Sequence, residues 1–492
     1  MSGLLILAMT YSVGASHMYT SPCMLAAAVQ LQPGDVIEVD PGTYTDACQL
    51  TASGTSTQPI TVRGVGGARP VFDATGLDLS GSGPVPRAIF QLTNASYWVF
   101  EHLELKGGTN GSNNGAAFRV TAGGHDLTVR DCSIHDNQDG AMSDGPSTIV
   151  LENNDIFHNG ANDGQSHNLY LQGDTVRLVG NHIHDSVGGQ NVKLRTRYVE
   201  LVANVIENAG NYEIDLIQGA YTSMPNANAV LVGNLIIRAT SADNNSQTIL
   251  FGTDNPNDTT PSRNGALYAL GNTFVLRNAS NQLFHVLTSP SPPPATHVYL
   301  TNNIVHATVT GTRLTSDTAT SDLTTGSNNF ITTGIAGVPA ALTGTLTGAD
   351  PGFAGSADYH LAAGSPAIDA GDAAPMYADG TGAMQNGRPM LEPTPPIGSE
   401  PRYVVGGGVD LGAFEYGNAP PVGGDGMFGD DAGNGTKKPG GCCDAGSSGG
   451  GAGLLALLVG VAFRASGRCR RPSARGTHPR RRTPSRSGTD RP

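Results

Sequence analysis

A short pattern centred on asparagine recurs through the middle of this chain and constrains the fold more than any other feature. Alternating apolar and polar residues lead into an asparagine and then an apolar side chain, as in "RLVGNHI" and "VLVGNLI". The copies are centred on Asn154, Asn181, Asn204, Asn234, Asn272 and Asn302, and an earlier copy has Cys132 in the asparagine position. The successive spacings from Cys132 to Asn302 are 22, 27, 23, 30, 38 and 30 residues. A constant motif with variable insertions predicts a solenoid, because coils must stack while their loops can grow.

Each repeat has the pattern of β-structure. Apolar residues alternate with polar ones over short runs and show no helical spacing. A coil of about 22 residues can hold three short strands and their turns. The sequence therefore predicts an all-β protein, a right-handed parallel β-helix. The recurring asparagines are expected to stack in a turn, where their amides bond to one another and to the backbone.

Both ends of the repeat region resemble parts of extracellular β-helix proteins. The stretches "LQPGDVIEVDPGTY" (residues 31–44) and "QPITVRGVGGARPVFD" (residues 58–73) are similar to the opening coils of such proteins. The stretches "LAAGSPAIDAGD" (residues 361–372) and "VDLGAFEY" (residues 409–416) resemble the anchor-associated module that closes many surface β-helices. An open solenoid end exposes unpaired backbone and needs a cover. We therefore expect a cap over residues 346–417.

The distribution of charge argues against a nucleic-acid partner. The chain has 28 Lys and Arg against 41 Asp and Glu, and ten Arg but only one acid follow Phe463. Residues 1–463 therefore carry 28 − 10 = 18 cations and 41 − 1 = 40 acids, a formal charge of −22. Binding to a phosphate backbone requires a basic face, which this part of the chain is poorly suited to provide.

The N-terminus has features of an export signal. The stretch "LLILAM" (residues 4–9) followed by "GASH" has the short apolar core and small residues of a signal peptide, expected over residues 1–16. Exported proteins can hold disulfides, so Cys23 and Cys48, which flank one strand segment, are expected to pair. The alternative is two buried thiols. Cys132 lies within a repeat and is expected to be a buried, inert thiol.

The C-terminal part differs in composition from the repeats. It begins with a Gly-, Pro-, Asp- and Ser-rich stretch, which predicts a flexible linker. The segment "AGLLALLVGVAF" is shorter than the about 20 residues of a bilayer span, and a cluster of Arg follows it. Together with "GGCCDAG", it resembles the myxobacterial C-terminal sorting tail. That resemblance implies processing at Cys442 or Cys443, membrane contact through the tail only, and display on the cell surface; the alternative is a disordered basic tail.

These patterns divide the chain into six expected parts. They are a signal peptide (1–16), a β-helix (17–345), a cap module (346–417), a linker (418–451), a hydrophobic segment with its Arg cluster (452–471) and a basic tail (472–492). We expect the protein to be a monomer.

Three consecutive coils carry a cluster of polar side chains. They read "SHNLYLQG", "GQNVKLRT" and "NYEIDLIQG", in which Leu169, Val192 and Ile214 align and are expected in the core. Alternation then sends the intervening side chains outward, in columns spaced by about 4.8 Å from coil to coil. The residues expected on the outer face are Asn168, Tyr170, Asn191, Lys193, Glu213 and Asp215, with Gln172 and Arg195 two positions further along.

A column of this kind can carry out β-elimination on an acidic polysaccharide. Arg195 would neutralise the uronate carboxylate, Lys193 would take the adjacent proton, and Tyr170 would protonate the leaving oxygen. His167 precedes the Tyr170 strand and is a further candidate catalytic residue. The candidate substrate-binding residues are Asn168, Asn191 and Gln172.

The two acids of the third coil admit other roles. Glu213 and Asp215 offer the hard oxygen ligands that Ca²⁺ prefers. Their spacing on one strand also leaves open hydrolysis by two carboxylates. A further alternative is that Lys193 and Asp215 form only an exposed ion pair, typically worth under about 1 kcal/mol.

Taken together, these coils resemble a group of secreted bacterial β-helix proteins in which the matching strands read approximately HNxY, HxxKSR and YEID. The resemblance covers residues 20–302. It implies a fold similar to polysaccharide lyases, among them alginate- and chondroitin-cleaving enzymes that use Lys, Arg and Ca²⁺. This sequence departs from the group in having Gln190 where His is usual and Leu194 where Ser is usual. The expected function is action on, or binding of, an anionic polysaccharide; the alternatives are a non-catalytic glycan-binding or adhesion protein and a structural surface protein.

Histidines are concentrated near these coils. The stretches "SIHD" and "HIHD" place His135 and His184 at the same position of their coils, so we expect their rings to belong to a stack on the turn side. A transition-metal site would need three convergent ligands, which the sequence alone does not place. The six histidines within 60 residues are His125, His135, His158, His167, His182 and His184.

Overall fold

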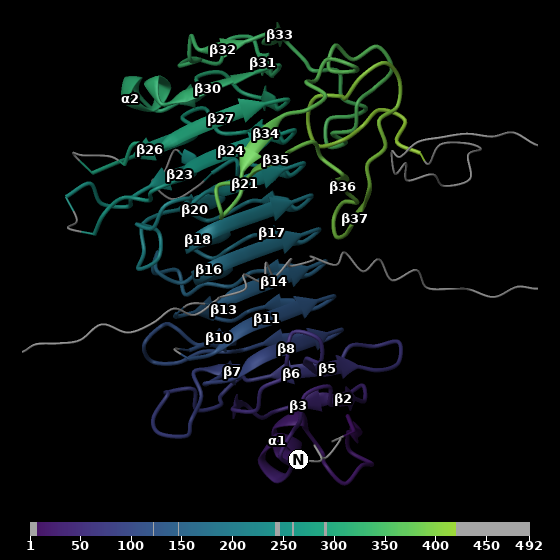
Figure 1. Cartoon of the computed structure of the whole chain (residues 1–492). Coiled ribbons are helices and arrows are strands. Elements are labelled where there is room, and N and C mark those ends of the chain that lie inside the picture. The colour runs from purple at the N-terminus through teal and green to yellow at the C-terminus, as the bar shows by residue number, and fades with distance from the viewer. Residues whose placement is uncertain are drawn as a thin grey trace, which may run out of the picture. The chain divides into compact units, whose positions relative to one another are not determined.

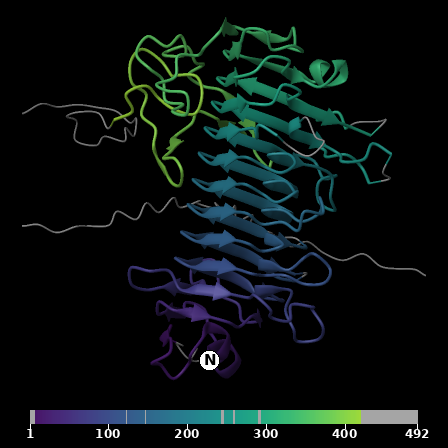
Figure 2. The ribbon, with the colours of Figure 1, turned by 180° about the vertical axis from the view of Figure 1, so that it is seen from behind.

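The computed structural model is a parallel β-helix, as the repeats predict (Figure 1). It describes residues 7–121, 123–145, 147–241, 247–257, 260–289 and 293–419. The described strands form a 21-stranded and a 12-stranded sheet, both parallel, and two short antiparallel hairpins. Crossovers between parallel strands take the right-handed path, which gives the predicted right-handed β-helix. Figure 2 shows the same pile of coils from behind.

The large sheet consists of two stacks of strands because the chain turns a corner within each coil. The long strands β16 and β18 run through both stacks, pairing with different neighbours at their two ends. The first stack contains β4 (Cys48–Leu50), β7 (Ala88–Leu92), β10 (Ala116–Val120), β13 (Asp139–Ser143), the first halves of β16 (Leu169–Val179) and β18 (Val192–Val202), β20 (Ile214–Leu216), β23 (Gln247–Gly252), β26 (Gln282–Leu287) and β29 (Arg313–Thr315).

The second and third stacks complete each coil. The second contains β1 (Thr10–Val13), β2 (Val36–Val39), β5 (Ile60–Gly64), β8 (Ser96–Glu101), β11 (His125–Arg130), β14 (Thr148–Glu152), the second halves of β16 and β18, β21 (Ala229–Val232), β24 (Ala266–Leu270), β27 (His297–Thr301), β30 (Thr324–Ser327) and β32 (Leu342–Thr343). The third contains β3 (Thr43–Tyr44), β6 (Val71–Asp73), β9 (Glu104–Lys106), β12 (Ser133–His135), β15 (Asp155–Phe157), β17 (His182–His184), β19 (Val205–Glu207), β22 (Leu235–Ile237), β25 (Thr273–Leu276), β28 (Ile304–Ala307), β31 (Phe330–Thr332) and β33 (Leu346–Gly348).

The core is a pile of apolar side chains from the inner faces of all three stacks. Leu169, Val192 and Ile214 lie in register in β16, β18 and β20 and are fully buried, which confirms the predicted core column. Burying one such side chain contributes about 1.5–3 kcal/mol relative to leaving it exposed. Since every coil repeats the pattern, the hydrophobic stabilisation accumulates along the whole solenoid.

The predicted asparagine ladder is present in the turn between the second and third stacks. Each amide donates to the side-chain oxygen of the next asparagine over 2.9–3.1 Å. One position is corrected: the ladder continues through Asn303, whereas Asn302 precedes it with a φ of +62°. A left-handed residue precedes most ladder positions, Gly180 and Gly233 among them, and an asparagine tolerates that conformation. The ladder residues are Asn154, Asn181, Asn204, Asn234, Asn272, Asn303 and Asn329.

The helix α1 (Pro22–Ala28) covers the N-terminal end of the pile (Figure 1). Ser21 caps it by accepting from the backbone N–H of Met24 at 3.1 Å, and Pro22 occupies the first turn, where no N–H is needed. Cys23 is buried on the inner side of the helix and forms a disulfide with Cys48 in β4. The pairing that the sequence suggests is therefore the one in the structure.

The first strand begins before residue 16, where the sequence predicted the end of the signal peptide. β1 pairs in parallel with β2, and Val13 is fully buried in the core. The backbone N–H of Met9 also donates to Asp35 at 2.8 Å. Residues 10–13 are thus part of the first coil, so the β-helix begins before the predicted start at residue 17.

The C-terminal module follows β33 and contains the hairpins β34 (Met376–Ala378) with β35 (Met384–Asn386) and β36 (Leu391–Pro393) with β37 (Ser399–Pro401). Its residues Tyr359 and Phe414 pack on Val205, Leu235 and Val275 of the third stack. The sequence predicted a cap for the open end; in the structure the module packs along the flank of the third stack, from β19 to β31 (Figure 1). The outward side chains of these strands are largely apolar and require a cover.

Apart from residues 418 and 419, the expected linker, the hydrophobic segment and the basic tail lie outside the described residues, as do Cys442 and Cys443. Among the described residues, no helix has the length and apolar character needed to cross a membrane. Cys132 is buried, and burial raises the pKa of its thiol to about 12, as expected of an unreactive thiol.

Candidate functional site

Tyr170, Lys193 and Asp215 form a column on the outer side of the first stack. They occupy matching positions in β16, β18 and β20. Lys193 Nζ lies 3.0 Å from Asp215 Oδ2, and the two side chains are 12 % and 1 % exposed. The register is as predicted, but the exposure is not. This ion pair is largely withdrawn from solvent, unlike the exposed pair considered from the sequence.

Arg195 lies two residues beyond Lys193 on β18 and is held from three directions. Its Nε donates to Tyr170 Oη at 3.2 Å, and its two Nη atoms donate to the backbone carbonyl of Gln218 and to Asp254 Oδ2. Burial disfavours the charged guanidinium, but Tyr170 and Asp254 outweigh this and raise the pKa of Arg195. Arg195 is therefore a fixed cation that joins the column to Asp254.

Tyr170 accepts a hydrogen bond from Arg195 at its hydroxyl oxygen. The oxygen accepts from Arg195, so the proton can be donated to another group. The ring of His167 packs edge-on against the Tyr170 ring, with 5.4 Å between ring centroids. Tyr170 is thus oriented on two sides, by Arg195 at its hydroxyl and by His167 at its ring.

His167 is buried and does not project from the face. Its Nδ1 accepts from the backbone N–H of Gln190 at 3.2 Å, which places the ring hydrogen on Nε2. Burial, together with the nearby charges of Lys193 and Arg195, holds the pKa of His167 well below its usual range. His167 is therefore a neutral residue that positions Tyr170, and the geometry does not favour the direct catalytic role predicted for it.

Asn168, Asn191 and Glu213 do not face outward, so their predicted contacts with substrate or Ca²⁺ are wrong. Each stands one position before its strand and is fully buried in the turn that leads from the third stack. Asn168 Nδ2 donates to Asn191 Oδ1, and Asn191 Nδ2 donates to Glu213 Oε2, each at 2.8 Å. They continue a second ladder that begins with Asn137 and Asn159.

Glu213 ends this ladder in a fully buried ion pair with Arg238, at 3.3 Å. The backbone N–H of Ala209 also donates to it at 3.1 Å. Burial raises the pKa of Glu213 to about 7, although Arg238 and the hydrogen bonds oppose the shift. Because the Glu213 oxygens already bind Arg238 and the Ala209 N–H, only Asp215 of these two acids lies on the outer face. The two acids do not form the Ca²⁺ site expected from the sequence, nor a pair suited to hydrolysis.

The structure adds Asp254 to the site, a residue that the sequence did not indicate. Asp254 follows β23 in the next coil and binds both Arg195 and the amide of Gln218, the latter at 2.8 Å. Extending the alignment by one coil would have placed Leu250 beside Asp215 and brought Asp254 near Arg195. Burial raises the pKa of the Asp215 carboxyl, with Lys193 opposing the shift.

The column of Tyr170, Lys193 and Asp215 continues toward the N-terminus on the same face. Arg119 and Met142 precede Tyr170 in the column, and an Arg119 nitrogen donates to Asp144 at 2.7 Å. A hollow of about 300 Å³ lies beside them and is lined by Arg87, Gln91 and Arg119 among others. Cationic groups therefore extend over several coils of the first stack.

The third cation of the "KLRTR" segment has a different role. Arg197 lies where β18 turns from the first stack into the second, and its Nε donates to Asp174 at 2.9 Å. A second nitrogen donates to the backbone carbonyl of Gly380 in the C-terminal module at 2.7 Å. Arg197 thus fastens the module to the coils and does not belong to the candidate site.

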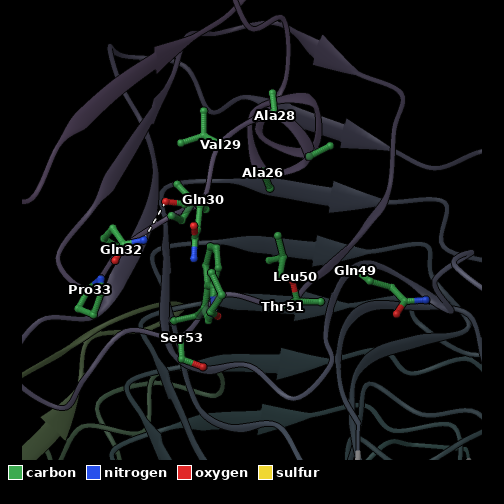
Figure 3. A pocket seen from close by; sticks show the side chains of 14 residues that line it. Ala26, Ala28, Val29, Gln30, Gln32, Pro33, Gln49, Leu50, Thr51 and Ser53 are labelled. Carbon is green, nitrogen blue, oxygen red and sulfur yellow. Dashed lines mark hydrogen bonds between the residues drawn. The ribbon is translucent and has the colours of Figure 1, made fainter.

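A separate hollow of about 570 Å³ lies near the N-terminal end (Figure 3). Its walls are mainly Ala26, Val29, Leu50 and neighbouring polar uncharged residues, and Gln32 donates to the backbone carbonyl of Gln30 at 3.1 Å. Among the described residues that line it, none carries a carboxylate, amine, guanidinium or imidazole group. This hollow lacks the groups needed for acid–base chemistry.

The expected ring stack is present, but on strands of the third stack and not in a turn. The rings of His135 and His184 both pack on Phe157, with centroid separations of 4.8 and 5.0 Å. These residues stand at matching positions of β12, β15 and β17.

Comparison with known proteins supports the fold. The sequence matches no protein-family model and no curated protein sequence. Among solved structures, pectate lyase Pel9A is similar at 16 % identity and a TM-score of 0.50, covering 84 % of this chain and 98 % of that one. An alginate lyase from Paenibacillus sp. has 18 % identity and a TM-score of 0.43, covering 59 % and 97 %. A rhamnogalacturonan lyase has 14 % identity and a TM-score of 0.43, covering 65 % and 87 %. The likeness to Pel9A agrees with the coil architecture: the chain has a pectate-lyase-like parallel β-helix fold.

Proposed function

We propose that this protein binds an acidic polysaccharide along the outer face of the first stack and cleaves it by β-elimination. The observation that carries the proposal is the contact of Arg195 with the Tyr170 hydroxyl beside the Lys193–Asp215 pair. The reaction requires a cation for the uronate carboxylate, a base for the adjacent proton and an acid for the leaving oxygen. The cluster contains one candidate for each. The likeness in fold to a pectate lyase is consistent with this function.

Lys193 is the proposed base, with Asp215 as its proton acceptor. An ammonium has no lone pair, so Lys193 must first pass a proton to Asp215. That carboxyl is suited to receive it because burial raises its pKa. The neutral amine then abstracts the proton beside the uronate carboxylate. The released electron pair forms the new carbon–carbon double bond as the bond to the glycosidic oxygen breaks.

Tyr170 and Arg195 complete the proposed reaction. Tyr170 donates its hydroxyl proton to the departing oxygen, since that hydroxyl accepts and does not donate in its contact with Arg195. Arg195 neutralises the uronate carboxylate. To do so, it exchanges its partly exposed partner Asp254 for the carboxylate of the substrate.

The test is a panel of alginate, pectate, chondroitin and hyaluronan, followed by ultraviolet absorbance of the unsaturated product. On the substrate that is cleaved, Lys193→Ala is expected to lower turnover by about 10²–10⁴-fold. Tyr170→Phe should also lower turnover, while Arg195→Ala should mainly weaken binding. Arg177→Ala is the matched control, because Arg177 also pairs with carboxylates but lies on the second stack. Near-full turnover of Lys193→Ala would contradict the assignment of the base.

A second candidate function is binding without cleavage. It is favoured by the observation that both cations of the site already have carboxylate partners, Lys193 with Asp215 and Arg195 with Asp254. Such a surface is preorganised for a polar ligand without supplying a free base. Retention of one of the four polymers on immobilised protein, with neither unsaturated product nor new reducing ends, would support this function over the first.

We also propose that the chain is exported and displayed on the cell surface through its C-terminal tail. The proposal is supported by the resemblance of the tail to a sorting signal and by the Cys23–Cys48 disulfide, which is typical of exported proteins. Protease added to whole cells should digest the protein. Deletion of residues 441–471 should release it into the medium. Recovery of intact protein from the cytosol of protease-treated cells would contradict surface display.

A further inference from the structure

A cluster of potential metal ligands lies on the outer side of the third stack, away from the Lys193 column. Asp155 in β15 pairs in register with His182 in β17, and His184 follows two residues later on the same side of that strand. The two imidazole rings lean together, with 3.8 Å between their centroids. Three side chains from two adjacent strands therefore converge on one point of the face.

The distances between the ligand atoms suit a small cation. Asp155 Oδ1 lies 3.4 Å from His182 Nδ1 and 3.2 Å from His184 Nε2, and all three atoms lie within 4.8 Å of one another. Tetrahedral zinc has ligand bonds of about 2.0–2.2 Å, which separates neighbouring ligand atoms by about 3.3–3.6 Å. The two separations from Asp155 Oδ1 are close to that value, so an ion could enter with small side-chain movements.

The second nitrogen of each imidazole faces a carboxylate. His182 Nε2 lies 3.1 Å from Glu207 Oε1, and His184 Nδ1 lies 2.6 Å from Asp185 Oδ2. Histidines that bind metals usually donate their other ring N–H to a carboxylate or carbonyl, which fixes the tautomer and orients the ring. Both rings therefore have an outer partner in place as well as a shared inner ligand.

From this geometry we propose that Asp155, His182 and His184 bind one divalent transition-metal ion, of which Zn²⁺ is the best match. Two imidazole nitrogens and one carboxylate oxygen suit Zn²⁺ and its neighbours, whereas Ca²⁺ and Mg²⁺ prefer oxygen ligands alone. The side chains are 27 %, 12 % and 17 % exposed, so an ion can reach them and solvent can supply a fourth ligand. The site is independent of the function proposed for the first stack.

Neighbouring coils lack the complete set. In β12, His135 stands where His184 stands in β17 and also contacts two carboxylates, Asp136 and Glu104. Ser133, however, occupies the position of His182. On the other side, β19 has Val205 at this position. The three ligands therefore come together at one level of the solenoid.

The experiment is a calorimetric titration of ZnCl₂ into the purified full chain after removal of metals with a chelator. One ion per chain is expected at this site. Zinc affinity should fall by about 100-fold or more in each of three variants, His182→Ala, His184→Ala and Asp155→Asn. Loss of a direct ligand should cost at least as much as loss of an outer-shell partner, which lowers metal affinity by about 10–100-fold. CaCl₂ should not compete. Co²⁺ should give the intense visible absorption of a tetrahedral complex, and each of these variants should lose it.

His158→Ala is the matched control, because this neighbouring imidazole also contacts a carboxylate, at 2.6 Å, but lies outside the three ligands. It should leave zinc affinity and the cobalt spectrum unchanged. Thermal unfolding of the apo forms separates loss of a ligand from misfolding, and Asp155→Asn keeps the shape of the side chain. The proposal is overturned if the wild type takes up no Zn²⁺, or if a folded ligand variant binds it as tightly as the wild type.

Discussion

Two columns of polar side chains run two residues apart along the same coils, yet their surroundings differ. Asn168, Asn191 and Glu213 form a fully buried ladder, in which each side chain bonds to the next. The column of Tyr170, Lys193 and Asp215 faces the outer side of the first stack, and Lys193 retains some exposure. The ladder holds the coils together, whereas the column contains the groups of the proposed site.

The difference shows where strand alternation stops being a valid guide. β16, β18 and β20 begin at Leu169, Val192 and Ile214, so the ladder residues stand one position before each strand. Alternation of faces holds only for extended backbone inside a strand. A residue in the turn points where the turn directs it, and here that is the interior between coils.

The largest expected effect comes from breaking the ladder at its charged end. Glu213→Ala removes the carboxylate partner of the buried Arg238, which should lower the free energy of unfolding by about 3–5 kcal/mol. Urea denaturation measures this change. Glu213→Gln, which keeps the shape and one acceptor oxygen, should cost less. A loss under about 1 kcal/mol, typical of an exposed pair, would contradict the buried position of Glu213.

The next effect concerns β13, in the coil before that of Tyr170, where Asp139 is buried and accepts from the backbone N–H of His167 at 2.9 Å. Burial raises the pKa of Asp139 to about 8, from about 4 in an unfolded chain. Between these values the folded state holds a proton that the unfolded state has lost, so stability falls as pH rises from about 4 to about 8.

The asparagine side chain in Asp139→Asn resembles the protonated carboxyl and does not titrate. The substitution should therefore remove the pH dependence of stability that Asp139 causes. The variant is expected to gain stability relative to the wild type as pH rises from 5 to 8, by an amount on the order of a few kcal/mol. Urea denaturation at both pH values measures the difference, in which contributions from other groups cancel. A difference that is constant with pH would contradict the raised pKa.

A smaller effect is expected in the second column. Lys193→Ala leaves the buried Asp215 without its cation, which should lower the free energy of unfolding by about 1–3 kcal/mol. This exceeds the change of under about 1 kcal/mol expected for an exposed pair. Adding Asp215→Asn to Lys193→Ala should restore part of the loss. Arg63→Ala, which breaks the more exposed pair with Glu38, is the stability control.

The smallest effect is expected at Gln172, which aligns with Arg195 on the outer side of the first stack. Gln172→Ala should change the free energy of unfolding by less than about 0.5 kcal/mol, as is usual for a partly exposed site. If Gln172 contacts substrate as predicted, the variant should bind the cleaved polymer more weakly while remaining as stable as the wild type. Unchanged binding would remove Gln172 from the site.

The sequence predicted a large part of the fold because the fold repeats. The motif around Asn154 and its copies fixed the coil, the ladder and the register that aligns Tyr170, Lys193 and Asp215. It misplaced the ladder residue at Asn302 by one position, because two asparagines are adjacent there and only the turn conformation distinguishes them. It also misjudged Asn168, Asn191 and Glu213, because their strands begin one residue later than the pattern suggests.

By itself, the sequence determined the repeating coil and the side chains that stack from one coil to the next. These features depend on period-two alternation and on spacing, which are local properties of the chain. Only the tertiary structure decided the partners: Asp254 for Arg195, Arg238 for Glu213 and Gly380 for Arg197. Each of these contacts crosses a loop or a module boundary. Insertions change the spacing between coils, so no sequence period specifies which groups meet.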